Sequence, residues 1–360
     1  MRARGESSAL AVWVATVVAV AGIAAANGYN PFHGSTWSRY DSAHYEDIAR
    51  DGYELARCPP GVWKPGAWCG DAGWFPAYPW LVRPLHAAGL PLRGSAVAVS
   101  WLFAGATLVL LWRTFWRGRR DALALAAVVY AAWAPGQIYG YSIFPLSVLA
   151  FFTVAWLWLL GRGRFFAAGL AGAAAVLAYP LGVLVIPVSA LWIVVRRRAW
   201  VTTVLAAAGL AVLFVDQQLE TGHWNAYQLV QRNYGHHLLD PLATTRDLLK
   251  PLWSSSELTH VGPALQSLLV TCVLLAVVVD ALRRRRWLVH AELLVLVWAV
   301  VAWLVPLSQS YVSLQRSQAA LLPVAVLLPR LPRPLVVAFA VAAVVVAVLM
   351  ETLFLDGKIV

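Results

Sequence analysis

The chain has 360 residues, of which 61% are hydrophobic and only 12% are charged. Soluble domains carry about 25% charged residues, so this composition excludes an ordinary soluble domain and indicates an integral membrane protein. The net charge of +11 does not indicate a nucleic-acid partner, because the basic residues are mostly arginines, many of them in short clusters between apolar segments. The expected fold class is an all-α membrane protein that forms one polytopic domain over residues 1–360.

The first apolar segment follows Arg2 and Arg4 and covers Ala9 to Ala26. A cleaved signal peptide is one interpretation, since the segment ends in the small residues that cleavage sites require. We favour an uncleaved first span, because the segment has about the eighteen residues that can cross a bilayer.

Apolar segments of spanning or nearly spanning length recur along the chain and predict about eleven transmembrane helices. They cover residues 9–27, 95–116, 121–138, 143–160, 165–179, 181–195, 199–215, 263–281, 287–306, 314–329 and 334–352. The two segments beside Tyr179 and Pro180 are alternatively one kinked segment, because proline breaks the helical hydrogen-bond ladder.

Arginine clusters between these segments support the count. With about eleven spans every cluster falls on one side of the membrane, as the positive-inside rule expects for the cytoplasmic face. The clusters are Arg2/Arg4, Arg117/Arg119/Arg120, Arg162/Arg164, Arg196 to Arg198, Arg283 to Arg286 and Arg330/Arg333. The two long loops, residues 28–94 and 216–262, are then extracytoplasmic.

The segment from Trp74 to Leu90 is apolar and aromatic but is interrupted by prolines. Counting it as a span would invert every later arginine cluster. We therefore predict a juxtamembrane helix, interfacial or re-entrant, with Trp74, Phe75, Tyr78 and Trp80 at the level of the lipid headgroups.

The three cysteines divide between a loop and a span. Cys58 and Cys69 share the first long loop, where they form a disulfide or remain two unpaired thiols, because spacing alone does not establish the geometry. Cys272 lies within an apolar span and is expected to be a small packing residue.

A helix is predicted from Asp41, which can serve as its N-cap, to Gly52, which is a natural stop. Tyr45, Ile48 and Ala49 recur at helical spacing and form its apolar side. Asp41 lies at the leading end of that side, where an ionised carboxylate needs a partner, a capping role or a catalytic role.

The other acidic residues of this segment are Glu46, Asp47, Asp51 and Glu54. Glu46 and Asp47 project opposite to the apolar side at 100° per residue. The simplest interpretation of all four is the solvated face of an amphipathic helix on the outer membrane surface.

The segments "RYDSAHYEDIARDGY" and "WFPAYP" resemble the first-loop motif pair of PIG-V type mannosyltransferases, the GPI mannosyltransferase 2 family and its bacterial relatives. These enzymes belong to the GT-C class of multi-spanning glycosyltransferases. Weaker similarities lie in "TGHWNAYQLVQRNYG" and "RSQAALLP". The chain departs from the pattern at Tyr40 and Trp74, where the family has Trp and Phe, and "LAYPLG" lacks the Arg expected before Pro180.

The resemblance implies a GT-C-like bundle that transfers a sugar, mannose by analogy, from a polyprenyl-phosphate donor to a lipid, glycan or protein acceptor with inversion. Asp41 matches the family's aspartate and would be the general base. Cationic groups must stabilise the leaving phosphate, and the extracytoplasmic candidates are Arg316, Arg232, His236 and His237. Structural or solvated roles are the alternative for these four residues.

Two further sets of residues are candidates for binding. Glu46 and Asp47 would orient the acceptor or bind a divalent metal ion, although no complete metal site is visible. Trp74, Phe75 and Tyr78 would contact the isoprenoid chain of the carrier, and an ordinary aromatic belt explains them as well.

A polytopic transporter or lipid flippase is the alternative function, and a non-catalytic scaffold is a third. Transporters tend to show interrupted helices and ionisable residues at mid-membrane, whereas Asp280 and Glu292 lie near an arginine cluster and indicate interface positions. The composition favours a bacterial plasma membrane with the active site outside, and an endoplasmic reticulum membrane would fit the same topology.

Overall fold

The computed structural model describes residues 3–116, 121–235, 237–283, 290–309 and 313–359. The α-helices are α1 (Ala3–Ala26), α2 (Ser42–Asp51), α3 (Ala77–Ala87), α4 (Leu92–Thr114), α5 (Ala122–Ala132), α6 (Ile138–Tyr141), α7 (Leu146–Gly161), α8 (Phe165–Ala178), α9 (Val185–Leu191), α10 (Trp200–Thr221), α11 (Ala226–Gln231), α12 (Pro241–Leu249), α13 (Pro251–Ser254), α14 (Leu258–Arg283), α15 (His290–Leu307), α16 (Leu314–Ser317) and α17 (Arg333–Leu355). The 3₁₀-helices are η1 (Gly34–Trp37), η2 (Pro180–Leu184), η3 (Trp192–Val194), η4 (Arg197–Ala199), η5 (Arg232–Tyr234), η6 (Gln318–Val326) and η7 (Leu328–Arg330).

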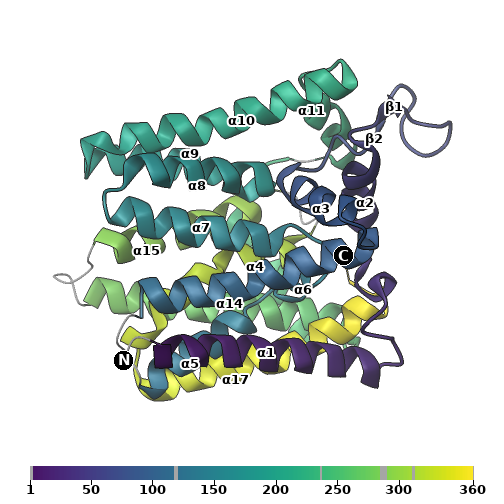
Figure 1. Cartoon of the computed structure of the whole chain (residues 1–360). Coiled ribbons are helices and arrows are strands. Elements are labelled where there is room, and N and C mark those ends of the chain that lie inside the picture. The colour runs from purple at the N-terminus through teal and green to yellow at the C-terminus, as the bar shows by residue number, and fades with distance from the viewer. Residues whose placement is uncertain (1–2, 117–120, 236, 284–289, 310–312, 360) are drawn as a thin grey trace.

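The chain folds into a bundle of roughly parallel helices, which confirms the all-α class. Figure 1 shows α10, α8, α7, α4 and α1 lying in succession, and each of these helices contacts the next. Helix α17 packs on α14 and α5. Small residues permit the closest approaches: a Cβ added at Gly209 of α10 would lie 2.7 Å from the Ala173 carbonyl oxygen of α8.

Five helical segments in the described part of the chain are long and apolar enough to cross a membrane. They are Ser8–Ala26, Leu92–Thr114, Arg197–Thr221, Leu258–Arg283 and Arg333–Leu355. Shorter apolar helices cover Ala122–Ala132, Leu146–Gly161, Phe165–Ala178, Pro180–Val194 and Ala291–Leu307. The structure is therefore compatible with a membrane protein, and the count of about eleven spans stays a prediction.

Two predicted spans are shorter or differently wound than expected. Helix α5 ends at Ala132 because Pro135 disfavours helical backbone in the residue before it. The segment predicted as a span at 314–329 forms α16, then a nine-residue 3₁₀ run from Gln318 to Val326 in which every residue is buried. Pro323 within this run cannot donate a backbone hydrogen bond.

The break predicted at Tyr179 is confirmed. Helix α8 ends at Ala178, Tyr179 has extended backbone with φ −162° and ψ 152°, and Pro180 begins η2. The turn is tight, because a Cβ on Gly182 would lie 1.8 Å from the carbonyl oxygen of Ala175. Only glycine fits at that position.

One end of the bundle carries most of the short elements. Figure 1 shows α2, α3, β1 (Leu55–Arg57) and β2 (Trp68–Gly70) at this end, together with α11 and the C-terminus, whereas the N-terminus lies at the opposite end. The two strands pair antiparallel, with Ala56 opposite Cys69.

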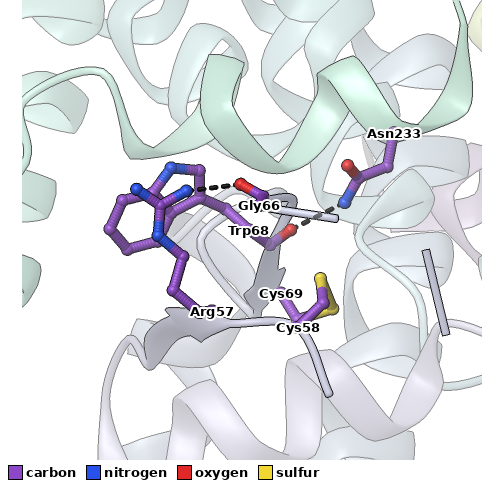
Figure 2. The surroundings of a disulfide bond; sticks show 6 residues. All are labelled: Arg57, Cys58, Gly66, Trp68, Cys69 and Asn233. Atoms are coloured by element: carbon purple, nitrogen blue, oxygen red, sulfur yellow. Dashed lines mark hydrogen bonds between the residues drawn. A yellow bond between two sulfur atoms is a disulfide. The ribbon is translucent and has the colours of Figure 1, made fainter. Parts of the chain in front are cut away.

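A disulfide joins Cys58 to Cys69, which is the first of the two alternatives for these residues. Figure 2 shows the surroundings: the Arg57 guanidinium lies 3.9 Å from the centroid of the Trp68 ring, and Asn233 donates a 2.6 Å hydrogen bond to the Trp68 carbonyl oxygen. The hairpin is thereby attached to the segment just after α11. The packing role expected for Cys272 is wrong, because this unpaired cysteine is exposed on α14.

Candidate functional site

A cavity of about 380 Å³ lies at the end of the bundle that carries α2 and α11. Its aromatic lining residues are Tyr45, Trp74, Tyr179, Tyr227 and Tyr234. Its polar lining residues are Asp41, Gln231, Gln309, Ser313, Arg316 and Ser317. Aromatic walls with a few convergent polar groups are typical of small-molecule sites of this volume.

An ion pair between Asp41 and Arg316 lies in this cavity. Arg316 Nη1 donates to Asp41 Oδ2, and Nη2 donates to Ser313 Oγ. Arg316 is only 5% exposed, whereas the Asp41 side chain is 28% exposed. The Asp41 carboxylate is therefore the more accessible partner, and the Arg316 guanidinium is buried by the surrounding protein.

The surroundings of Arg316 are largely aromatic. Its Cζ atom lies 5.5 Å from the ring centroid of Phe144 and 6.0 Å from that of Tyr139. Its buried Nε atom has no hydrogen-bond acceptor among the described residues. The positive charge of Arg316 is attracted to the faces of these rings. Its Nε–H group remains a buried donor that no described residue accepts from.

The backbone beside both charged residues adopts an uncommon conformation. Tyr40, directly before Asp41, has φ 52°, and Ser313, which contacts Arg316, has φ 62°. These are the only two non-glycine residues with positive φ in the described part of the chain. Such conformations cost about 1–3 kcal/mol each and cluster at functional sites, so the surrounding fold holds the two segments in place.

Asp41 occupies the N-cap position of α2, as predicted, but its side chain makes no capping hydrogen bond. The carboxylate instead pairs with Arg316. The apolar side predicted for α2 is confirmed, since Tyr45, Ile48 and Ala49 are buried. Burial raises the pKa of Tyr45 well above 10.0, so its phenol keeps its proton where it lines the cavity.

Trp74 forms part of the wall and is fixed by two contacts, with His44 and with Tyr53, and His44 is itself held by Asp71. The ring of His44 stacks on Trp74 at a centroid distance of 3.4 Å, and His44 Nδ1 lies 2.5 Å from Asp71 Oδ1. The Tyr53 hydroxyl donates a 2.8 Å hydrogen bond to the Trp74 carbonyl oxygen. Helix α2 and the loop after β2 are therefore coupled at this wall.

Helix α11 contributes Tyr227 and Gln231 to the cavity lining and is bonded to the same loop. Gln231 Nε2 donates to the Gly73 carbonyl oxygen at 2.9 Å. Buried Gln217 of α10 donates to the Ala72 carbonyl oxygen at 2.8 Å and accepts from the Tyr227 amide at 3.0 Å. These amide bridges hold the first-loop and second-loop segments together.

Contact with the lipid headgroups, as predicted for the aromatic segment, is wrong for Trp74, Phe75 and Tyr78, which are 7%, 2% and 0% exposed, and their depth in the membrane stays a prediction. Trp74 lines the cavity, but Phe75 and Tyr78 do not. Tyr78 donates to the Ala96 carbonyl oxygen at 2.8 Å, and Phe75 packs on Tyr227 at 5.3 Å between ring centroids. The protein covers these rings, because α3 lies against α2 and α4.

The solvated position predicted for Glu46 is also wrong. Glu46 is 6% exposed, and it accepts hydrogen bonds from Ser38 Oγ at 2.6 Å and Arg93 Nε at 2.9 Å. Helix α2 is covered on this side as well by α4, so helical periodicity alone misplaced the residue. Asp47 is partly exposed and pairs with Arg50 on the outer face.

Neither Glu46 nor Asp47 lines the cavity, and within the described residues no three His, Cys, Asp or Glu side chains gather as a metal site would require. Arg232 and His237 are exposed and lie outside the cavity lining. His236 lies outside the described residues. Of the predicted cationic candidates in the described part, Arg316 is the one that the fold brings to Asp41.

Several lining residues were not singled out from the sequence. Tyr227, Gln231 and Tyr234 stand at spacings i, i+4 and i+7, a signal that places them on one helix face. Tyr179 is marked by the proline that follows it. Gln309 has no comparable signal in the sequence.

Neither the models of known protein families nor the curated proteins compared with it match this chain. The fold and the cavity define the protein as an all-α, membrane-compatible helical bundle with a polar and aromatic cavity at one end.

Proposed function

We propose that the protein is a membrane glycosyltransferase that transfers a sugar, mannose by the motif resemblance, from a polyprenyl-phosphate donor to a lipid or glycan acceptor with inversion. The observation that carries the proposal is the meeting of Asp41 and Arg316, 275 residues apart in sequence, inside an aromatic cavity. A carboxylate and a fixed cation are the two groups that this transfer requires.

The proposed reaction uses the ion pair as a switch. The donor phosphodiester competes with Asp41 for the Arg316 guanidinium, whose planar donors suit phosphate, and its negative charge rises from one to two as the sugar leaves. Asp41 is then released to accept the proton of the acceptor hydroxyl as that oxygen attacks the anomeric carbon. The bond from that carbon to the phosphate oxygen breaks, and Arg316 stabilises the charge left on the leaving group.

The cavity walls support a sugar as the transferred group. Tyr45, Trp74 and Tyr227 offer aromatic faces and hydroxyl groups, and Gln231 and Gln309 offer amides. Amides and hydroxyls both donate and accept hydrogen bonds, as the hydroxyls of a hexose require. The proposed orientation, with this cavity on the extracytoplasmic side of a bacterial plasma membrane, is supported by arginines Arg162 and Arg196 to Arg198 at the opposite end.

The test is transfer by the purified protein in liposomes, with radiolabelled polyprenyl-phosphate-mannose and a lipid extract. Asp41→Asn removes the base without changing shape and should lower the rate about 10²–10⁴-fold. Asp47→Asn, on the same helix but outside the cavity lining, is the matched control and should retain the wild-type rate. A panel of other lipid-linked sugars then tests the choice of mannose.

Both variants must show unfolding midpoints close to that of the wild type, because Asp41→Asn leaves Arg316 without its carboxylate. Undiminished transfer in a folded Asp41→Asn variant would remove Asp41 as the base. If the wild-type protein transfers sugar from none of the donors tested, the assignment as an enzyme is excluded.

A lipid flippase is the second candidate, because interrupted helices border the cavity. Tyr179 and Pro180 break one helical segment, and α16 leads into the buried 3₁₀ run of η6. Transporters use such breaks at their binding sites. Movement of the labelled carrier between leaflets without sugar transfer, in the same liposomes, would favour this function.

A further inference from the structure

A second hollow lies at the end of the bundle opposite the cavity. It has a volume of about 350 Å³ and is formed where α7 turns into α8 and where η3 leads through η4 into α10. Four arginines line it, Arg162, Arg196, Arg197 and Arg198, together with Gly163 and Phe165. We call this hollow the arginine cleft.

None of the four arginines has an acidic partner in the described part of the chain, and no acidic residue lines the cleft. Arg330, elsewhere in the bundle, is paired with Glu292. A topology signal requires positive charge near the membrane, but it does not require four cations to converge on one hollow. Their mutual repulsion is relieved if an anion binds among them.

The arginine cleft is separate from the Asp41 cavity. Helix α8 begins beside the cleft at Phe165 and ends at Ala178, next to the cavity residue Tyr179. Its 14 residues correspond to a length of about 21 Å at 1.5 Å per residue. Figure 1 shows that α8 begins at the end of the bundle away from α2, α3 and α11 and runs toward them. A donor phosphate at Arg316 therefore does not reach the cleft.

Several apolar side chains close in sequence to the lining residues of the cleft are exposed. Phe166, Leu191, Val194 and Trp200 are 63%, 60%, 91% and 56% exposed, and each lies within five residues of a lining residue. Exposed apolar groups beside a cationic hollow at a helix end match a lipid, whose phosphate and acyl chains are joined in one molecule. A free anion would use the arginines but not these side chains.

We propose that the arginine cleft binds the phosphate group of an anionic membrane phospholipid whose acyl chains lie along the exposed apolar side chains of α8, α9 and α10. Guanidinium groups bind phosphate through parallel N–H donors, and four of them provide more donors than one phosphodiester can use. The lipid would hold the α7–α8 and α9–α10 connections together from the cytoplasmic side.

The experiment is native mass spectrometry of the full chain in detergent, titrated with phosphatidylglycerol or with phosphatidylcholine of the same acyl chains. Phosphatidylglycerol should bind at least about tenfold more tightly, and Arg196→Gln with Arg198→Gln should abolish that preference. Arg283→Gln with Arg333→Gln removes the same charge from exposed arginines at the ends of α14 and α17 and should preserve it.

Equal losses in the two double variants would overturn the proposal, because the preference would then follow net charge and not the cleft. Inorganic phosphate and glycerol 3-phosphate form the second arm, and neither should displace the lipid at millimolar concentration. Displacement by either would assign the cleft to a soluble anion and overturn the lipid assignment. The readout is binding, so failure of sugar transfer leaves this result unaffected.

Discussion

Replacement of Glu46 by glutamine tests whether helix α2 is covered on two sides. The sequence pattern places Glu46 and Asp47 together on a solvated face, whereas the structure buries Glu46 and leaves Asp47 partly exposed. Glu46→Gln and Asp47→Asn remove one charge each from neighbouring positions without changing shape. If Glu46 is solvated, the two substitutions should lower the free energy of unfolding equally little. If Glu46 is buried, Glu46→Gln should lower it more than Asp47→Asn does.

The magnitude follows from the two bonds to Glu46. Loss of charge weakens the 2.6 Å bond from Ser38 by about 1 kcal/mol. The bond from Arg93 is lost, but its side chain is 50% exposed, so solvent reduces that contribution to about 1 kcal/mol. Glu46→Gln should cost about 2 kcal/mol in the free energy of unfolding, a fall of a few degrees in the midpoint.

Thermal unfolding of the purified protein in detergent, followed by intrinsic tryptophan fluorescence, measures both variants under one scan rate. Asp47→Asn should leave the midpoint unchanged, since its partner Arg50 lies on the exposed face. A reduced transfer rate should accompany the Glu46 change, because Ser38 leads into the strained residue Tyr40 before Asp41. Equal midpoints for the two variants would refute the burial of Glu46.

Three further outcomes are expected. Arg316→Lys should lower the transfer rate about tenfold or more, since a point charge cannot reproduce the planar donors, and a wild-type rate would exclude a specific guanidinium role. Reduction of the Cys58–Cys69 disulfide, 11 residues apart in sequence, should lower the unfolding midpoint by the equivalent of about 2–3 kcal/mol, while Cys272→Ser leaves it unchanged. Burial raises the pKa of Tyr53 well above 10.0, so the folded state binds more protons than the unfolded state and stability falls as pH rises above 10.0. Tyr53→Phe should make that decline shallower, and an identical decline would contradict it.

The sequence predicted the helical class, the break before Pro180 and the importance of Asp41 and Arg316 as separate candidates. Hydrophobicity and helix-breaking residues are local properties, so they can be read from neighbouring positions. The contact between Asp41 and Arg316 joins residues 275 positions apart and leaves no local trace. The prediction that Glu46 is solvated was wrong for the same reason, because Glu46 is buried against α4, whose Arg93 binds it.

The amino-acid sequence by itself determined where the apolar segments lie, where arginine accumulates and which segment carries the acidic helix, because each depends on composition or on a short repeat. Only the tertiary structure decided that Trp74 is a wall of a cavity, that the first and second loops join through Gln217 and Gln231, and that four unpaired arginines converge at the opposite end. Such arrangements arise when helices distant in sequence pack side by side. Packing depends on the shapes and contacts of both partners, which neither segment encodes alone.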